Sequence, residues 1–271
     1  MKFKDRLWIW GQNAGSHHRV PGFRLPGVNR MESREGCEYL GIPNCCRVVL
    51  PAGPEPPFDR ESEKLASLRS VVWSAVGACG VSRNDRDGSD LDEVLRQAEL
   101  FPNVSGAVLD DFFASSETLA SGGPLVRHSL ESLKTMRDRL HSFPKRKLDL
   151  WLVWYDYQLD YPVEDYVDCC DVITHWTWNA SELPRLEKNL AKARELAPGK
   201  RCFAGVYMWD YGAGKPMTVE EMRHQCGICC DWIRAGKLDG MIFCSNCIAD
   251  LGLEAVEWAK KWIHEKAEED F

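Results

Sequence analysis

The chain has 271 residues, 44% of them hydrophobic and 28% charged, which is typical of a globular protein with a sizeable core. Its 34 Lys and Arg against 41 Asp and Glu give a net charge of −7. This charge argues against nucleic acid as the main partner, because nucleic-acid binding needs a basic surface. No stretch has the composition of an interdomain linker, so residues 1–271 are expected to form a single domain.

The N-terminal residues include a short apolar patch but lack the apolar region and small-residue cleavage site of a secretory signal. No window approaches the ~18 consecutive apolar residues of a membrane span. We therefore expect a cytoplasmic protein that does not bind membranes, and the sequence leaves its oligomeric state open. The 12 cysteines lie mostly in core-like runs, so they are predicted to be reduced and to pack as small hydrophobic residues.

Apolar runs alternate along the chain with segments of helical periodicity. The predicted strands are residues 7–11, 45–50, 70–77, 104–109, 148–154, 171–178, 202–209 and 238–244. The predicted helices are residues 31–40, 61–68, 90–100, 125–140 and 161–169, a helix capped by Ser181 and stopped by Gly199, a helix opened by the capping box of Thr218 and Glu221, and residues 253–263.

Eight strand-then-helix units in about 250 residues predict a (β/α)8 TIM barrel. The strands are continuously apolar rather than alternating, which is typical of parallel strands that are buried on both faces. The alternative is an open, doubly wound sheet, which would need a glycine-rich phosphate-binding turn after an early strand. Residues 11–16 imitate such a turn only loosely, so the barrel is favoured.

Residues that follow the strands of a barrel lie on one rim, where barrel enzymes place their active sites. In this chain that rim combines carboxylates, which can supply acid and base, with aromatic rings, on which sugars can stack. The candidate catalytic residues are Asp110, Asp111, Asp156 and Asp210. The candidate substrate-binding residues are Gln12, His17, His18, Tyr155, Trp176, Trp178, Tyr207, Trp209 and Asn246. Two further tryptophans, Trp73 and Trp151, are expected to fill the barrel interior.

The apolar fourth strand that ends in Asp110 and Asp111 resembles the barrel glycoside hydrolases that act on N-acetylhexosamine glycosides. In that group the acetamido oxygen of the substrate is the nucleophile. The resemblance implies that Asp110 orients the acetamido group and that Asp111 is the general acid. The same strand ends also resemble those of uncharacterised barrel proteins, a likeness that implies no substrate.

Adjacent strand residues point to opposite faces, so Asp110 and Asp111 share a site only if the strand has already ended. Otherwise one of them is structural, and Asp156 or Asp210 supplies the second carboxylate. Their separation would then decide between retention and inversion of the anomeric configuration.

No cofactor or metal is predicted. Cys226, Cys229, Cys244 and Cys247 have the spacing of a structural zinc site. Packing explains them better, because the first pair falls within a predicted helix and Cys244 ends a core strand. The rim residues favour a glycoside hydrolase that uses carboxylate acid/base catalysis on a carbohydrate substrate. The alternatives are a metal-dependent sugar isomerase, epimerase or lyase using His17 and His18, a non-catalytic carbohydrate-binding barrel, and an enzyme acting on another substrate.

Overall fold

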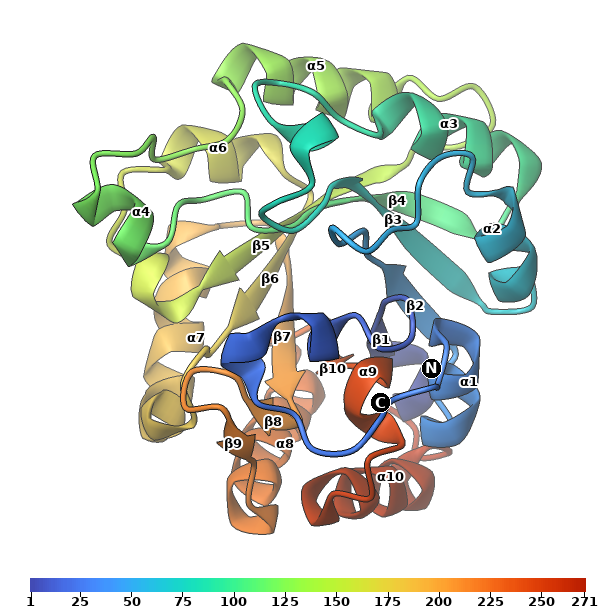
Figure 1. Cartoon of the computed structure of the whole chain (residues 1–271), viewed down its shortest axis with the longest axis vertical. Helices are drawn as coiled ribbons and strands as arrows, with labels where there is room; N and C mark the ends of the chain where they lie inside the picture. Colours follow the sequence, from blue (N-terminus) through green and yellow to red (C-terminus); the bar gives the residue numbers. More distant parts are fainter.

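The computed structural model describes all 271 residues, and its centre is a closed barrel of eight parallel strands (Figure 1). Around the barrel the strand order is β1-β10-β7-β6-β5-β4-β3-β2. The strands are β1 (Leu7–Gly11), β2 (Asn44–Arg47), β3 (Ser70–Val76), β4 (Val104–Leu109), β5 (Asp149–Tyr155), β6 (Val172–Trp176), β7 (Arg201–Tyr207) and β10 (Gly240–Cys244). The (β/α)8 barrel predicted from the sequence is confirmed.

Helices surround the barrel and cover its outer face (Figure 1). They are α1 (Ser33–Leu40), α2 (Asp59–Leu65), α3 (Leu91–Leu100), α4 (Ser116–Ala120), α5 (Leu130–His141), α6 (Glu164–Cys169), α7 (Leu186–Leu196), α8 (Val219–Arg234), α9 (Asn246–Ala249) and α10 (Glu254–Lys266). The capping box of Thr218 and Glu221 opens α8 as predicted. No helix combines the length and the apolar character needed to cross a lipid bilayer.

The predicted cap at Ser181 is wrong. Residues Ala180–Arg185 form a 3-10 helix, and the α-helix begins only at Leu186. Pro184 accounts for the difference, because a proline disfavours the α conformation of the residue before it. The sequence also missed the short helices α4 and α9 and the two-stranded hairpin of β8 (Trp209–Asp210) and β9 (Lys215–Pro216).

Aromatic side chains fill the barrel interior in two layers. In one layer Trp8 packs against Trp151, with 4.9 Å between ring centroids. In the other, nearer the carboxyl ends of the strands, Trp10 packs against Trp176 at 5.1 Å, and Trp176 against Tyr207 at 5.0 Å. The contacts of Trp8 with Trp151 and of Trp10 with Trp176 join strands that are not neighbours in the barrel, so these rings point inward, as in the layers that fill barrels of this type.

The expectation for Trp73 was only half right. Its side chain is buried, but it stacks on Phe58 and donates a hydrogen bond to Ser62 in α2, so it points outward.

His175 on β6 is buried with no hydrogen-bond partner on either ring nitrogen, and burial lowers its pKa from 6.5 to about 4. At pH values between these two pKa values, His175 is protonated in the unfolded chain but not in the folded one. The free energy of unfolding therefore falls as the pH drops through this window. We expect the stability of wild type relative to His175→Leu to fall by about 2 kcal/mol between pH 7.5 and 5. Urea unfolding of both proteins at both pH values measures this change, and a stability difference that does not change with pH would contradict it.

Candidate active site

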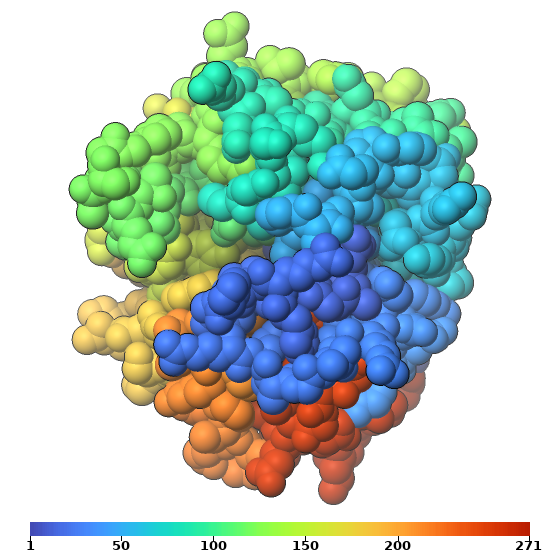
Figure 2. Space-filling view, in the orientation of Figure 1, coloured from blue at the N-terminus to red at the C-terminus, as the bar shows by residue number.

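Two adjoining cavities open at the carboxyl ends of the barrel strands. The inner cavity, of about 240 Å³, lies over the mouth of the barrel, and the outer cavity, of about 680 Å³, extends from it toward α4. Figure 2 shows this face hollowed between the blue N-terminal loop and the green segment that carries α4. The two cavities share four lining residues, which are Cys79, Asp111, Tyr155 and Trp178.

The inner cavity is built from strand ends and covered by the loop that follows β1. Its remaining lining residues are Trp10, Gln12, His17, Val20, Phe23, Leu50, Pro51, Ala78, Asp110, Tyr207, Tyr211 and Cys244. The outer cavity is completed by Phe113, Ala114, Ser115, Ser116, Glu117, Thr118, Pro124, Arg127, Tyr157 and Asn179. Eleven of the 16 residues that line the inner cavity are hydrophobic, against six of the 14 that line the outer cavity.

Asp110 and Asp111 both line the inner cavity because β4 ends at Leu109. Asp110 continues the inward-facing series of the strand. Asp111 would face outward in a continued strand, but its backbone has φ +44°, a left-handed conformation in which aspartate and asparagine are enriched. The turn brings the second carboxylate to the same cavity, so the sequence-based condition that the strand has already ended is met.

Hydrogen bonds fix the Asp111 carboxylate at the junction of the two cavities. One oxygen accepts from the Tyr155 hydroxyl at 3.0 Å, and the other accepts from the backbone N–H of Cys79 at 3.1 Å. These bonds hold the side chain in one orientation, with Asp111 exposed to both cavities.

Asp110 is buried at the floor of the inner cavity, and one of its carboxyl oxygens accepts the backbone N–H of Asp111 at 3.0 Å. Burial and the neighbouring charge of Asp111 raise the pKa of the Asp110 carboxyl well above its usual value, and Arg127 opposes this only in part. Asp110 therefore keeps its proton at pH values where an exposed aspartate would have lost it.

His17 lines the inner cavity as a neutral ring. Burial and the neighbouring His18 lower its pKa from 6.5 to about 3. Its Nδ1 pairs with the Tyr211 hydroxyl at 2.7 Å. The imidazole therefore carries no positive charge near neutral pH.

Five aromatic rings pack around the inner cavity, most of them edge to face and Tyr211 stacked on Trp178. Tyr211 lies 5.1 Å from Tyr207, 4.7 Å from Phe23 and 5.9 Å from Trp178, measured between ring centroids. Tyr155 lies 5.8 Å from Trp178. These rings line the same cavity as the Asp110 carboxyl.

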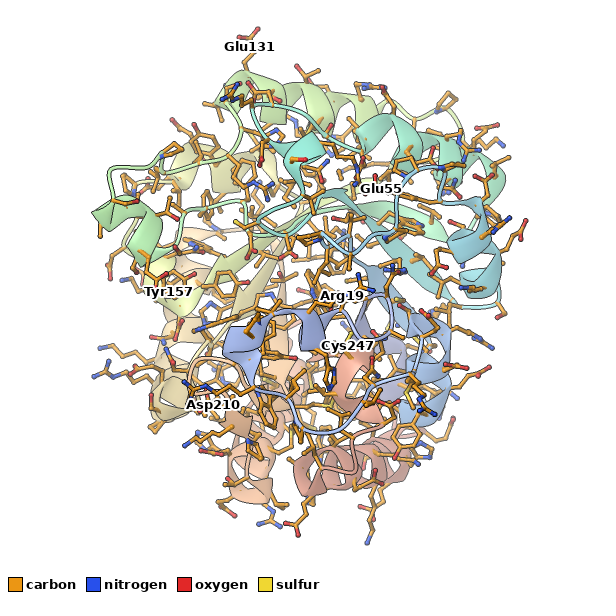
Figure 3. All side chains as sticks on the ribbon, in the orientation of Figure 1. Arg19, Glu55, Glu131, Tyr157, Asp210 and Cys247 are labelled. Atoms are coloured by element: carbon orange, nitrogen blue, oxygen red, sulfur yellow. The ribbon has the colours of Figure 1, made fainter.

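Six of the sequence-predicted site residues line neither cavity. They are His18, Asp156, Trp176, Trp209, Asp210 and Asn246. Asp210 is buried and accepts backbone N–H groups of Ala180 and Ala213, which anchors the β8–β9 hairpin. In Figure 3 it lies on the other side of the N-terminal loop from Tyr157.

The other residues outside the cavities hold nearby backbone. The Asn246 side chain bonds the backbone N–H and carbonyl of Gln12, which fixes the end of β1. Trp209 donates to the carbonyl of Phe23, and a ring nitrogen of His18 pairs with the carbonyl of Pro26. These contacts position the loop that covers the inner cavity.

The residues of the metal-dependent alternative do not form a cluster of metal ligands. No group of three or more His, Cys, Asp or Glu side chains is arranged as a set of metal ligands. All 12 cysteines are unpaired, and every one except Cys79 is buried. The pair Cys226 and Cys229 packs within α8, as expected from its periodicity.

Sequence reasoning missed several lining residues, including Cys79, Phe23, Tyr157 and Arg127. The alternation of the strands could have found part of the inner cavity, because residues two apart face the same side. If every second residue is followed along the inward-facing side of a strand and just beyond it, the series includes Gln12, Leu50, Ala78 and Cys244, which all line the inner cavity. No such rule reaches Phe23 or Arg127, which come from long loops.

Neither a protein-family model nor any curated protein matches the sequence. Solved structures match its fold at low identity. The spore cortex-lytic enzyme SleL of Bacillus megaterium QM B1551 has a TM-score of 0.56 and 10% identity, over 97% of this chain and 74% of that one. A GH113 β-1,4-mannanase has a TM-score of 0.53 and 12% identity, over 97% and 99%.

A chain of the tryptophan synthase complex of Pyrococcus furiosus also matches, with a TM-score of 0.51 and 13% identity over 98% of both chains. At these identities the likeness shows the fold alone. The protein thus has a barrel similar to those of glycoside hydrolases, and the same architecture serves unrelated chemistry.

Proposed function

We propose that the protein is a glycoside hydrolase whose catalytic pair is Asp110 and Asp111. The observation that carries the proposal is the Asp111 carboxylate at the junction of two cavities, with Asp110 beside it and aromatic rings around both. Glycoside hydrolysis needs a carboxylic acid to protonate the leaving oxygen and a second carboxylate near the anomeric carbon. The barrel fold shared with a GH113 β-1,4-mannanase is consistent with this chemistry.

In the proposed arrangement the inner cavity holds one sugar and the outer cavity holds the leaving group. The scissile bond then lies beside Asp111. The proton held by Asp110 passes to Asp111, which donates it to the glycosidic oxygen. The bond to the anomeric carbon breaks, and the leaving group departs as an alcohol. Asp110, left as a carboxylate, stabilises the positive charge that develops on the sugar ring. Water then adds to the anomeric carbon and returns a proton to the pair.

Hydrolysis of a panel of nitrophenyl glycosides tests this proposal. The panel should include neutral, N-acetylated and free-amino sugars in both anomeric forms, each with and without EDTA. We expect nitrophenol release from at least one glycoside, at the same rate with chelator. Release from none of them, or release that EDTA abolishes, would contradict carboxylate catalysis by this pair.

A further inference from the structure

The inner cavity combines negative charge with aromatic rings and has no cationic side chain. Asp110 and Asp111 are its only acidic residues, and no Lys or Arg lines it. His17 is neutral there because burial lowers its pKa to about 3. Arg127, which partly offsets the charge at Asp110, lines only the outer cavity, so a ligand in the inner cavity meets the carboxyl groups and no cationic side chain.

The rings add a second attraction for positive charge. Tyr155, Trp178, Tyr207 and Tyr211 stand with neighbouring centroids 5.1–5.9 Å apart around the carboxyls. The face of an aromatic ring attracts an ammonium group, most strongly where water is excluded. All three tyrosines are buried, and burial raises the pKa of each hydroxyl, so the rings stay uncharged.

The size of the cavity limits the ligand to one small unit. Its volume of about 240 Å³ lies below the roughly 300–1,000 Å³ typical of pockets for drug-sized ligands. A single pyranose ring is a ligand of this small size.

We infer that the inner cavity binds a sugar that carries a free, protonated amino group, in preference to its N-acetylated or hydroxylated counterpart. This inference rests on the proposed function and names the class of sugar that the site would take. A bound ammonium group would also favour the ionised form of Asp110, so that the proton held by Asp110 is released toward the leaving group. Substrate binding would in this way prepare the acid.

Binding without hydrolysis tests the inference. Calorimetric titration of the full chain with methyl glucosaminide, methyl N-acetylglucosaminide and methyl glucoside, and with the corresponding galactose series, compares the three substituents. We expect about tenfold tighter binding of the amino sugar in at least one series. Equal affinities, tighter binding of the N-acetyl sugar, or no binding of any sugar would overturn the inference.

Two sets of variants identify the source of the preference. We expect Asp110→Asn to abolish the preference for the amino sugar, whereas Asp160→Asn, which removes an exposed carboxylate paired with Lys192, keeps it. Tyr207→Phe should keep the preference and Tyr207→Leu should reduce it, because only the first retains a ring. A preference that survives both Asp110→Asn and Tyr207→Leu would overturn the inference.

The outcome separates this inference from the proposed function. Hydrolysis of neutral glycosides without any preference for an amino sugar would overturn the inference and leave the hydrolase proposal standing. Selective binding of the amino sugar with no hydrolysis of any glycoside in the panel would support the amino sugar as the ligand of the inner cavity. The same result would contradict the proposed hydrolase function.

Discussion

Asp111→Asn is expected to lower kcat/KM on the best glycoside of the panel by about 10²–10⁴-fold, the usual contribution of a positioned general acid. The substitution suits the backbone, because asparagine also tolerates the left-handed conformation at this position. The amide oxygen can still accept the N–H of Cys79. The variant should therefore fold like wild type and lose only the transferable proton.

The leaving group distinguishes the roles of the two aspartates. A nitrophenolate departs with little protonation, whereas an alkoxide needs the acid. We expect the loss in Asp111→Asn to be much larger for methyl glycosides than for nitrophenyl glycosides, and the loss in Asp110→Asn to be similar for both. The reverse pattern would contradict the proposed assignment of acid and partner.

Asp156→Asn is the matched control, since Asp156 lies on the same rim but lines neither cavity. Its kcat/KM should stay within about threefold of wild type, as expected for a substitution away from the site. A loss as large as that of Asp111→Asn would show that the second carboxylate comes from β5.

Much of the barrel could be predicted from the sequence because each strand is a short, continuous apolar run. Elements without such a pattern were missed. The helix α4 has five residues and α9 has four, too few for any periodicity to show. The start of α5 was placed too early, because the side chain of Ser129 caps the helix by accepting the N–H of Ser132 at 3.2 Å.

The candidate site was predictable only where it follows the strands. Asp110, Asp111, Tyr155 and Tyr207 follow or end apolar runs, so their common rim could be inferred. The direction of Asp111 could not, since it depends on one backbone angle after the strand. The tryptophans show the same limit, because Trp178 lines both cavities whereas Trp176 lies beneath them in the barrel.

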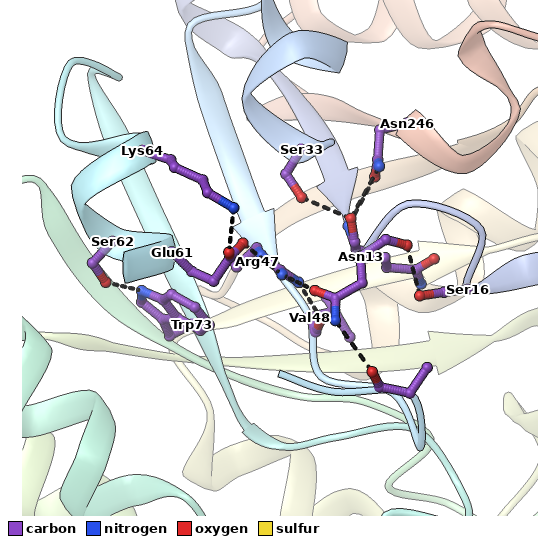
Figure 4. Close-up of polar contacts among 12 residues, drawn as sticks. Asn13, Ser16, Ser33, Arg47, Val48, Glu61, Ser62, Lys64, Trp73 and Asn246 are labelled. Carbon is purple, nitrogen blue, oxygen red and sulfur yellow. Dashed lines mark hydrogen bonds and ion pairs between the residues drawn. The ribbon is translucent and has the colours of Figure 1, made fainter. Parts of the chain in front are cut away.

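Arg47 is a buried charge in a strand that the sequence identified only as apolar. Its side chain has 0% exposure, and its guanidinium bonds Glu61 at 2.9 Å, the Val48 carbonyl at 2.9 Å and the Asn13 side chain (Figure 4). It also lies over the Trp73 ring, 5.6 Å from the centroid. Arg47 thereby joins β2 to α2 and to the loop that covers the inner cavity.

Glu61 depends on this arginine. Burial acts to raise the pKa of the Glu61 carboxyl, but the charges of Arg47 and Lys64 outweigh burial and lower it. The carboxylate therefore stays charged in a half-buried position. Removing Arg47 would leave this charge with Lys64 alone, at 2.6 Å from the other carboxyl oxygen.

We expect Arg47→Met to reduce the free energy of unfolding by about 3–5 kcal/mol, as found when one partner of a buried ion pair is removed. Arg96→Met is the control, because Arg96 pairs with Asp59 and Glu93 on an exposed surface and should lose only about 0–1 kcal/mol. In Arg47→Met/Glu61→Gln the stranded charge is gone, so part of the loss should be regained. Urea unfolding of the four proteins measures these differences. If Arg47→Met were no less stable than Arg96→Met, the buried pair would not hold β2 against α2.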